Sequence, residues 1–361
     1  MKLLLLDGHS LAYRAFFALP TDLVTSSGTV TNAVYGFTAM LAKVLADERP
    51  EYLAVAFDAP GGSTERHTLD PEYKAGRAET PDLFRAQLPL IHEVLAALGV
   101  TVLEVSGVEA DDVIATLATQ AAAEAVDVVV VTGDRDSFQL VADPHIRVLY
   151  NKRGVSDYAR YDEAGIVERT GGVTPRQYVD YAALRGDSSD NLPGVPGIGE
   201  KTAAKLICAY DDLEGIYEHL DDLPPKQRAN LGEFRDRVFM NRTMSVLRRD
   251  VECGVEISNL GAQIPDVEVV RSLFLQLEFR TLLPRILDVL APAGEASGES
   301  AEFTVEVEYI ADVDRAAAAI RATADATEPV GLAGEWTGTP GRSALRGLAI
   351  ARDAGHAQVI D

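Results

Sequence analysis

The chain has 361 residues, enough for one large domain or for two to three smaller ones. Because 47% of the residues are apolar and 25% are charged, the composition is that of a globular protein and excludes a fibrous or disordered chain. No apolar run approaches the roughly 18 residues of a membrane-spanning helix. Cys208 and Cys253 are too far apart for a Cys-x-x-Cys metal site, so we expect a cytoplasmic protein without disulfides.

The formal net charge of −23 suggests that the chain as a whole repels nucleic acid. The charge is unevenly distributed, however. Residues 295–361 carry a net −7, whereas residues 226–249 contain seven basic residues against two acidic ones. A local basic face is therefore compatible with the acidic total, although the same residues also fit a solvated helix face.

Short runs rich in valine and leucine alternate with segments of helical period in the first half of the chain. The apolar runs are residues 3–6, 53–57, 100–105, 128–131 and 146–149. Between them, a helical apolar face begins near Thr31, and Thr80-Pro81 is typical of a helix start. This alternation predicts an α/β fold with a mostly parallel central sheet flanked by helices.

We expect four segments along the chain. Residues 1–173 form the α/β core, which includes a loop or arch at residues 60–80 without clear period. Short helices punctuated by Gly and Pro predict a helical subdomain over residues 174–290. Residues 291–301 have the composition of a linker. Residues 302–361 resemble the start of a second α/β domain whose last apolar run lacks a partner, so we expect a truncated domain there.

Acidic residues follow four of the predicted strands, at the point where each strand ends. They are Asp7, Asp58, Glu109, Asp111, Asp112, Asp134 and Asp136. Because the carboxyl ends of parallel strands share one edge of a sheet, we expect these side chains to converge. Asp187 and Asp190 would add a pair on one face if a helical turn forms there. A single Asp after a strand is more often a turn or helix cap, but four such strand ends favour a common site.

Carboxylates packed together repel one another unless protons or divalent cations neutralise them. A set of oxygen ligands suits Mg²⁺ or Mn²⁺ rather than zinc. Nine acids exceed the needs of one ion, and two ions about 3.5–4 Å apart stabilise both the attacking and the leaving oxygen of a phosphoryl displacement. The acids therefore predict metal-dependent hydrolysis of phosphodiesters.

Residues 192–202 place three glycines and two prolines directly before a helical segment. Backbone amides there could meet phosphates, as in a helix-hairpin-helix motif that holds duplex backbone without reading sequence. The residues expected to bind nucleic acid are Gly194, Val195, Gly197, Ile198, Gly199, Lys201 and Lys205. An ordinary turn is the alternative, and the two lysines favour the binding role.

In the arch, Arg66, Lys74 and Arg77 alternate with acids, and Tyr73 offers a ring that could stack on a base. The net charge of residues 64–77 is zero. A solvated loop with internal salt bridges is therefore an equally good interpretation of this segment.

Several of these motifs together resemble the 5′ nuclease domain of bacterial DNA polymerase I, over about residues 1–290. The matching segments are residues 6–14, 57–58, 73–77, 109–112, 133–136 and 186–202. The resemblance implies a flap endonuclease and 5′→3′ exonuclease with a PIN-like fold, acting in repair and Okazaki-fragment processing. It also implies a nucleoid-associated monomer joined to a polymerase domain.

The resemblance assigns roles to individual residues. The first metal site is implied to consist of Asp7, Asp58, Glu109, Asp111 and Asp112, and the second of Asp134, Asp136, Asp187 and Asp190. Arg14, Lys74 and Arg77 are implied to hold the scissile phosphate and the 5′ strand, and residues 194–199 to bind duplex DNA with K⁺. Residues 302–361 are similar to a 3′→5′ exonuclease-like domain, but Ala333 stands where a proofreading enzyme carries Asp, so we expect a degenerate domain.

Two other functions remain open. A PIN-like ribonuclease would also cluster acids on an α/β sheet, although the hairpin and the helical subdomain argue against it. A non-catalytic module that binds DNA junctions would use the basic residues alone, with structural acids.

Overall fold

The computed structural model describes residues 1–59, 64–77, 79–261, 265–290, 306–324, 330–337, 343–351 and 356–360. The chain falls into two compact units, Met1–Leu290 and Ala291–Asp361. The predicted linker at residues 291–301, and residues 60–63 and 78 of the arch, lie outside the described residues. Within the described ranges, no helix combines the length and the apolar character that crossing a membrane requires.

A six-stranded sheet forms the centre of the first unit, in the order β3-β2-β1-β4-β5-β6. Its strands are β1 (Lys2–Asp7), β2 (Tyr52–Ala56), β3 (Thr101–Leu103), β4 (Asp127–Thr132), β5 (Ile146–Arg153) and β6 (Asp157–Tyr161). The first five are parallel, as predicted, and β6 returns antiparallel to β5 at the edge. The sequence analysis missed β6 because its residues, DYARY, include no continuous apolar run.

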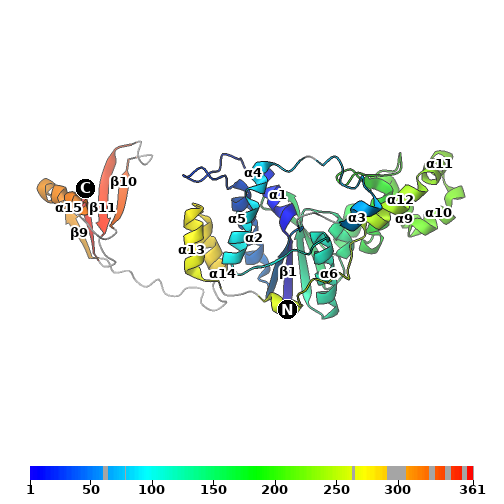
Figure 1. The fold of residues 1–361 in the computed structure, drawn as a ribbon, viewed down its shortest axis with the longest axis horizontal. Helices are drawn as coiled ribbons and strands as arrows, with labels where there is room; N and C mark the ends of the chain where they lie inside the picture. The colour runs from blue at the N-terminus through cyan, green and yellow to red at the C-terminus, as the bar shows by residue number, and fades with distance from the viewer. Residues whose placement is uncertain are drawn as a thin grey trace. The chain divides into compact units, whose positions relative to one another are not determined.

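Both faces of the sheet are covered, which explains why its central strands are apolar throughout. Leu3 and Leu5 of β1 pack with α6 (Ala110–Ala123), whereas Leu4 and Leu6 pack with α1 (Gly8–Ala18), α2 (Asn32–Glu48) and α5 (Leu88–Ala97). Figure 1 shows α2 and α5 on one side of β1 and α6 on the other. The two predicted helix starts lie within one residue of the observed ones. Thr31 is the N-cap of α2, and Pro81 is the N-cap of the short helix α4 (Asp82–Arg85) rather than its first residue.

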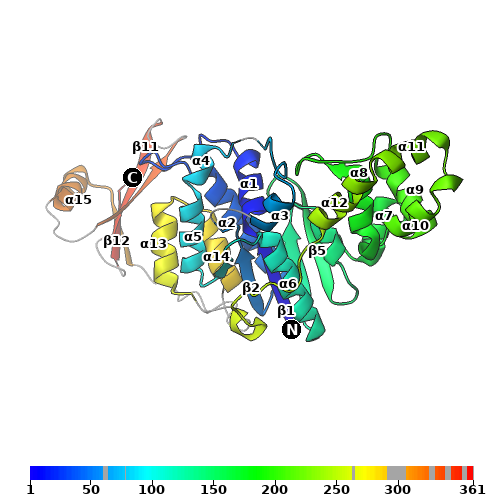
Figure 2. The same ribbon diagram turned by 45° about the vertical axis from the view of Figure 1, so that its right-hand side comes forward.

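The residues from 174 onward do not form one helical subdomain. The part that includes α8 (Tyr178–Arg185), α9 (Glu200–Tyr210), α10 (Leu213–Glu218), α11 (Pro225–Glu233) and α12 (Arg235–Ser245) gathers at one end of the unit. In contrast, α13 (Val267–Gln276) and α14 (Leu282–Leu290) return to α5 and α2, as Figure 2 also shows. The physical reason is an apolar face whose residues Val270, Phe274 and Ile286 are fully buried in the core beside α2 and α5.

The described residues of the second unit form a small sheet and one helix. Its order is β10-β11-β12-β9, formed by β9 (Glu306–Ile310), β10 (Gly331–Trp336), β11 (Leu345–Ala351) and β12 (His356–Ile360), with α15 (Val313–Ala324). The last apolar run was expected to lack a partner. Instead, β12 pairs with β11 on one side and β9 on the other, and Ile310, Ala319 and Ile350 form a small core.

The packing of α13 gives a direct test of the fold. Phe274→Ala should lower the free energy of unfolding by about 3–5 kcal/mol, because it opens a cavity in a fully buried apolar layer. The neighbouring Leu275 is 57% exposed, so Leu275→Ala should change the same quantity by no more than about 0.5 kcal/mol. Urea denaturation of both variants measures the difference, and equal effects would contradict the packing of α13 on the core.

Candidate active site

The order of the strands decides where the acids lie. Since β1 stands between β2 and β4, the residues that follow these three parallel strands meet at one edge of the sheet, where the strand order reverses. Asp7 ends β1, Asp58 follows β2, and Asp134 follows β4. These three side chains and Asp111 and Asp187 line one cleft, which we name the acidic cleft.

Asp7 is 5% exposed and has two functions at once. Its Oδ1 accepts the backbone N–H of Ser10 at 3.0 Å and so caps α1, as the simpler interpretation of such an Asp expects. Its Oδ2 accepts the hydroxyl of Thr132 at 2.7 Å. Burial nevertheless raises the pKa of Asp7 to about 7, and the nearby Asp58 and Asp134 add to the effect.

The pKa values of Asp111, Asp134 and Asp136 are raised as well, and those of Asp111 and Asp136 lie well above the usual value. Burial is the largest cause that raises the pKa of each, and repulsion by the other acids adds to it. For Asp111 the repelling groups are Asp7, Asp134 and Asp58; for Asp136 they are Asp134, Asp190 and Asp187. Asp134 thus contributes to both groups of acids. In addition, Oδ1 of Asp111 is buried without a hydrogen-bond partner among the described residues.

Asp187 and Asp190 are not joined by a helical turn. Asp187 lies in the two-residue strand β7 (Gly186–Asp187), which pairs with β8 (Leu192–Pro193), and a turn connects the two strands. The Asp187 carboxylate accepts the backbone N–H of Ser189 at 2.7 Å. Asp190 pairs with Arg77 instead, at 2.5 Å between carboxylate oxygen and Nη2.

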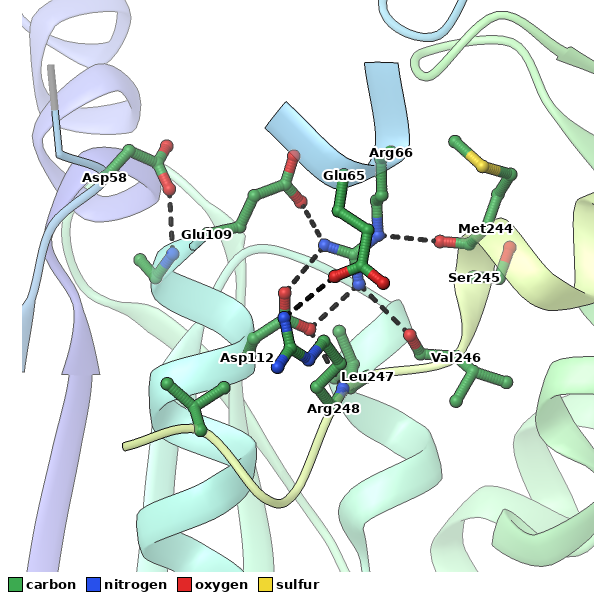
Figure 3. Close-up of polar contacts among 12 residues, drawn as sticks. Asp58, Glu65, Arg66, Glu109, Asp112, Met244, Ser245, Val246, Leu247 and Arg248 are labelled. Carbon is green, nitrogen blue, oxygen red and sulfur yellow. Dashed lines mark hydrogen bonds and ion pairs between the residues drawn. The ribbon is translucent and has the colours of Figure 1, made fainter. Parts of the chain in front are cut away.

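Glu109 and Asp112 differ from the other acids because both are paired with Arg66 (Figure 3). Arg66 lies on the short helix α3 (Thr64–Leu69) of the arch and is 7% exposed. The prediction that Arg66 contacts nucleic acid is therefore not met in this structure, because its guanidinium is buried among carboxylates and backbone carbonyls.

The remaining arch residues point into the same region. Nζ of Lys74 donates to Oε1 of Glu109 at 2.8 Å, and Nε of Arg77 donates to the backbone oxygen of Ser189. Tyr73 is 3% exposed, and its hydroxyl donates to Glu109 at 3.3 Å or to Asp190 at 3.1 Å. Its ring is thus not available to stack on a base, contrary to the prediction, because the arch folds it under the two carboxylates.

Arg14 lies beside Gly133, which lines the acidic cleft. It is on α1 and donates to the backbone oxygen of Lys152 at 3.2 Å. A Cβ at Gly133 would lie 2.9 Å from Nη2 of Arg14, so a larger residue there would displace this guanidinium. Arg14 is therefore placed where it can reach an anion bound at the cleft.

The hairpin before α9 divides into buried and exposed residues. Val195 and Ile198 are each 3% exposed in the main core, and their backbone N–H groups donate to carbonyls of Leu184 and Val195. Neither can bind nucleic acid through these groups, so their predicted role changes to anchoring the hairpin. Gly197 and Gly199 are exposed, and Gly197 has a φ of +80°, which glycine adopts without strain.

The lysines that follow are also on the surface. Lys201 and Lys205 are exposed in the first two turns of α9, which begins at Glu200. Gly194 lines the acidic cleft and packs so tightly that a Cβ there would lie 2.1 Å from the backbone oxygen of Arg185. The hairpin therefore connects the cleft to an exposed basic helix end.

Three residues of the site were not predicted. Thr132 binds Asp7, His9 accepts the backbone N–H of Asp58 through Nδ1 at 3.1 Å, and Arg185 lines the cleft beside Asp136. His9 lies two residues after Asp7, and Thr132 lies two residues before Asp134. Their closeness in sequence to a predicted acid could therefore have identified both. Nothing in the sequence distinguishes Arg185 from other helical arginines.

The donor set suits a divalent cation. In the described ranges, no group of three or more acidic, histidine or cysteine side chains is arranged so that it could hold a metal ion as it stands. The cleft nevertheless holds several carboxylates whose repulsion is uncompensated, and the orphan Oδ1 of Asp111 is an oxygen ligand without a partner. Hard cations such as Mg²⁺ prefer such oxygen ligands.

Comparison with known proteins gives two family matches. Residues 2–171 match the 5′-3′ exonuclease N-terminal resolvase-like domain, and residues 173–268 match the 5′-3′ exonuclease C-terminal SAM fold. DNA polymerase I of Mycobacterium tuberculosis is 51% identical over 297 residues, which are 81% of this chain and 32% of that protein. DNA polymerase I of Bacillus subtilis is 41% identical over 86% of this chain and 35% of that protein. The chain thus spans about a third of the length of these relatives.

Solved structures with the same fold include a 5′-exonuclease and a catalytic core bound to DNA. T5 5′-exonuclease with bound divalent zinc ions aligns with a TM-score of 0.57 at 20% identity, over 80% of this chain and 100% of that chain. The catalytic core of Rad2 in complex with DNA substrate aligns with a TM-score of 0.54 at 17% identity, over 80% of this chain and 92% of that one. These matches confirm the predicted α/β fold.

The raised pKa of Asp7 predicts a pH-dependent stability in the presence of chelator. Since the folded pKa of about 7 exceeds the usual 3.8, the folded state binds this proton more tightly, and ionisation between these pH values destabilises it. Asp7→Asn keeps an oxygen for the cap and removes the charge. Its stability relative to the unsubstituted protein should rise from pH 4 to pH 7, by up to about 4 kcal/mol, and stay constant above.

Thermal unfolding in EDTA at several pH values measures this difference. Asp47→Asn is the matched control, because the Asp47 side chain is 57% exposed and lies far from the cleft in sequence and fold. A difference between Asp7→Asn and the unsubstituted protein that does not change with pH would contradict the assigned burial effect.

Proposed function

The chain belongs to the 5′-3′ exonuclease family, and from this membership we propose that it is a structure-selective nuclease that hydrolyses DNA phosphodiesters at 5′ flaps and 5′ ends. The observation that supports the proposal is the acidic cleft, where Asp7, Asp111 and Asp134 have raised pKa values and Asp111 has an unpaired buried oxygen; the pKa of the neighbouring Asp136 is raised as well. Such a group of acids calls for cations, and Lys74 and Arg77 stand beside it.

The residues of the cleft would hold two divalent ions, Mg²⁺ or Mn²⁺. When bound, such ions lower the pKa of a water nucleophile and stabilise the leaving oxygen. The ligands we propose for one ion are Asp7, Asp58, Glu109 and Asp111, with Asp134, Asp136, Asp187 and Asp190 for the other. Asp134 repels Asp7 of the first group and Asp136 of the second, so its carboxylate would be shared between the two ions.

Lys74 and Arg77 would bind the scissile phosphate. In this structure their charges are directed at Glu109 and Asp190, at 2.8 and 2.5 Å. A phosphate that enters the cleft offers the same kind of charged oxygen, so these side chains can exchange a carboxylate for the substrate without leaving the cleft. Arg14, which lies beside Gly133, would hold the neighbouring 5′ phosphate.

The hairpin and α9 would hold the duplex. Gly197 and Gly199 expose backbone at the N-terminal end of α9, and Lys201 and Lys205 extend the positive surface. Contacts of this kind position a duplex without reading its sequence. A K⁺ ion could join the hairpin carbonyls to a phosphate, which would add to this binding.

We place this activity in DNA repair and in the processing of Okazaki fragments, in a monomeric nucleoid-associated protein that works beside a polymerase domain. The support is the likeness to DNA polymerase I of Mycobacterium tuberculosis and Bacillus subtilis, of whose length this chain spans about a third.

Cleavage of a labelled 5′ flap in Mg²⁺ tests the activity. Asp134→Ala should lower the cleavage rate at least about 1,000-fold, because a carboxylate shared by both acid groups is lost, while flap binding in EDTA stays unchanged. Asp127→Ala is the matched control: Asp127 lies at the opposite end of β4 and is exposed. Cleavage that persists in EDTA or in Asp134→Ala would contradict the two-metal proposal.

The same assay separates the alternatives. A matched RNA flap should be cut more slowly than the DNA flap, whereas a ribonuclease would prefer it. Binding of the flap without any hydrolysis in Mg²⁺ or Mn²⁺ would instead indicate a non-catalytic junction-binding module.

The role of α9 is tested by the salt dependence of duplex binding. Replacing both Lys201 and Lys205 by Ala should weaken binding uniformly across sequences and reduce the slope of log affinity against log salt concentration by about two. Lys43→Ala is the control, because Lys43 pairs with Asp47 on α2. Fluorescence anisotropy in EDTA measures the slope, and an unchanged slope would contradict duplex binding by α9.

A further inference from the structure

Arg66 uses every N–H of its guanidinium within the protein. Nε donates to the backbone oxygen of Met244 at 3.0 Å, and Nη2 donates to that of Val246 at 3.0 Å. Nη1 and Nη2 form a two-pronged pair with Asp112, at 2.8 Å each. Nη1 also donates to Oε2 of Glu109 at 2.8 Å. Five donors meet five acceptors, so the guanidinium has no hydrogen left for a phosphate.

These contacts join three segments that are far apart in sequence, one that carries the donor Arg66 and two that carry its acceptors (Figure 3). Arg66 belongs to α3 of the arch, Glu109 and Asp112 belong to the start of α6, and Met244 and Val246 lie at the end of α12. The outer side of this contact is closed by Arg248, whose side chain pairs with Glu65 at 2.8 Å. The base of the arch is therefore fastened to both the sheet layer and the helical end of the unit.

Asp112 is fully engaged by these contacts. Its Oδ2 accepts from Arg66, and its Oδ1 accepts from Arg66 and from the backbone N–H of Arg248 at 2.9 Å. Its side chain is only 3% exposed. Asp111, the preceding residue, lines the acidic cleft and leaves Oδ1 without a partner. The two neighbouring acids therefore face different surroundings.

Glu109 connects the two surroundings. Its Oε2 accepts from Arg66, while its Oε1 accepts from Lys74, and Glu109 lines the acidic cleft. Arg66 thus fixes one carboxylate oxygen of Glu109 and leaves the other directed toward Lys74. A guanidinium fork suits this task because it fixes direction as well as charge.

We propose that Arg66 is a positioning residue that orients Glu109 in the acidic cleft and fastens the arch, and that Asp112 anchors Arg66 and is not a metal ligand. This inference rests on the proposed function only where Glu109 is taken as a metal ligand. It changes two sequence-based assignments, since Arg66 was expected to bind nucleic acid and Asp112 to bind metal.

The direction of a stability change separates an anchor from a metal ligand. Without metal, Asp112→Asn should lower the melting temperature of the full chain by about 5 °C or more, because Arg66 loses its buried partner. Asp111→Asn is the matched neighbour and should raise it, because a buried charge without a partner is removed. If Asp112→Asn raised the melting temperature as Asp111→Asn does, the anchoring role would be wrong.

Mn²⁺ titration without DNA tests the link to the cleft. Arg66→Gln should weaken Mn²⁺ binding about 10-fold through misplaced Glu109, and the double variant with Asp112→Asn should weaken it no further. Asp111→Asn should instead add its full effect to that of Arg66→Gln. Additive effects of Arg66→Gln and Asp112→Asn would overturn the proposal, and so would unchanged Mn²⁺ affinity in Arg66→Gln.

Duplex binding in EDTA completes the test. Arg66→Gln should leave the salt slope of flap binding unchanged, whereas loss of a phosphate contact would reduce it by about one and would refute the positioning role. Should Arg66→Gln fold poorly, Arg66→Lys preserves the charge without the fork and should show the same weakened Mn²⁺ binding. Because none of these measurements uses cleavage, a failure of the nuclease proposal remains distinguishable from a failure of this one.

Discussion

Repulsion among carboxylates at one edge of a parallel sheet is the constraint on which the rest of the site depends. The strand order places the ends of β1, β2 and β4 together, and burial raises the pKa of the acids that follow them. Part of the repulsion is offset locally, as at Asp7, which accepts hydrogen bonds from Ser10 and Thr132. The rest calls for positive charge from outside the sheet.

The arch supplies that charge, and it does so in two ways. Arg66 is buried and saturated, so its contacts with Glu109 and Asp112 hold the structure together. Lys74 and Arg77 are more accessible, at 21% and 51% side-chain exposure, and their partners can be exchanged for a phosphate. The acids thus divide into those already neutralised by the fold and those left for ligands. Because only part of the repulsion between the acids is neutralised within the protein, the remaining carboxylates are free to bind ligands, as a candidate catalytic site requires.

The segments beyond the sheet complete the arrangement from opposite ends of the unit. The hairpin before α9 is anchored by buried Val195 and Ile198, and this anchoring is what leaves Gly197 and Gly199 at the surface. On the other side, α13 and α14 cover the layer formed by α2 and α5 and extend the core. Basic residues are concentrated at 226–249 despite the overall acidic charge, but four of them pair with acids, namely Arg228, Arg237, Arg242 and Arg248.

The sequence alone determined the elements whose signal is local. Continuous apolar runs of β-branched residues and leucine identified five strands, and the parallel order that follows from them brought Asp7, Asp58 and Asp134 to one edge. The glycines and prolines of residues 192–202 likewise predicted the hairpin. What only the tertiary structure decided were contacts between distant segments. The pairing of Arg66 with Asp112, the burial of Tyr73 under Glu109, and the return of α13 to α5 depend on which surfaces meet after folding. The sequence shows that a residue is charged or aromatic, but it does not show whether the side chain faces solvent or a buried partner. Those surroundings are set by residues that lie far away along the chain.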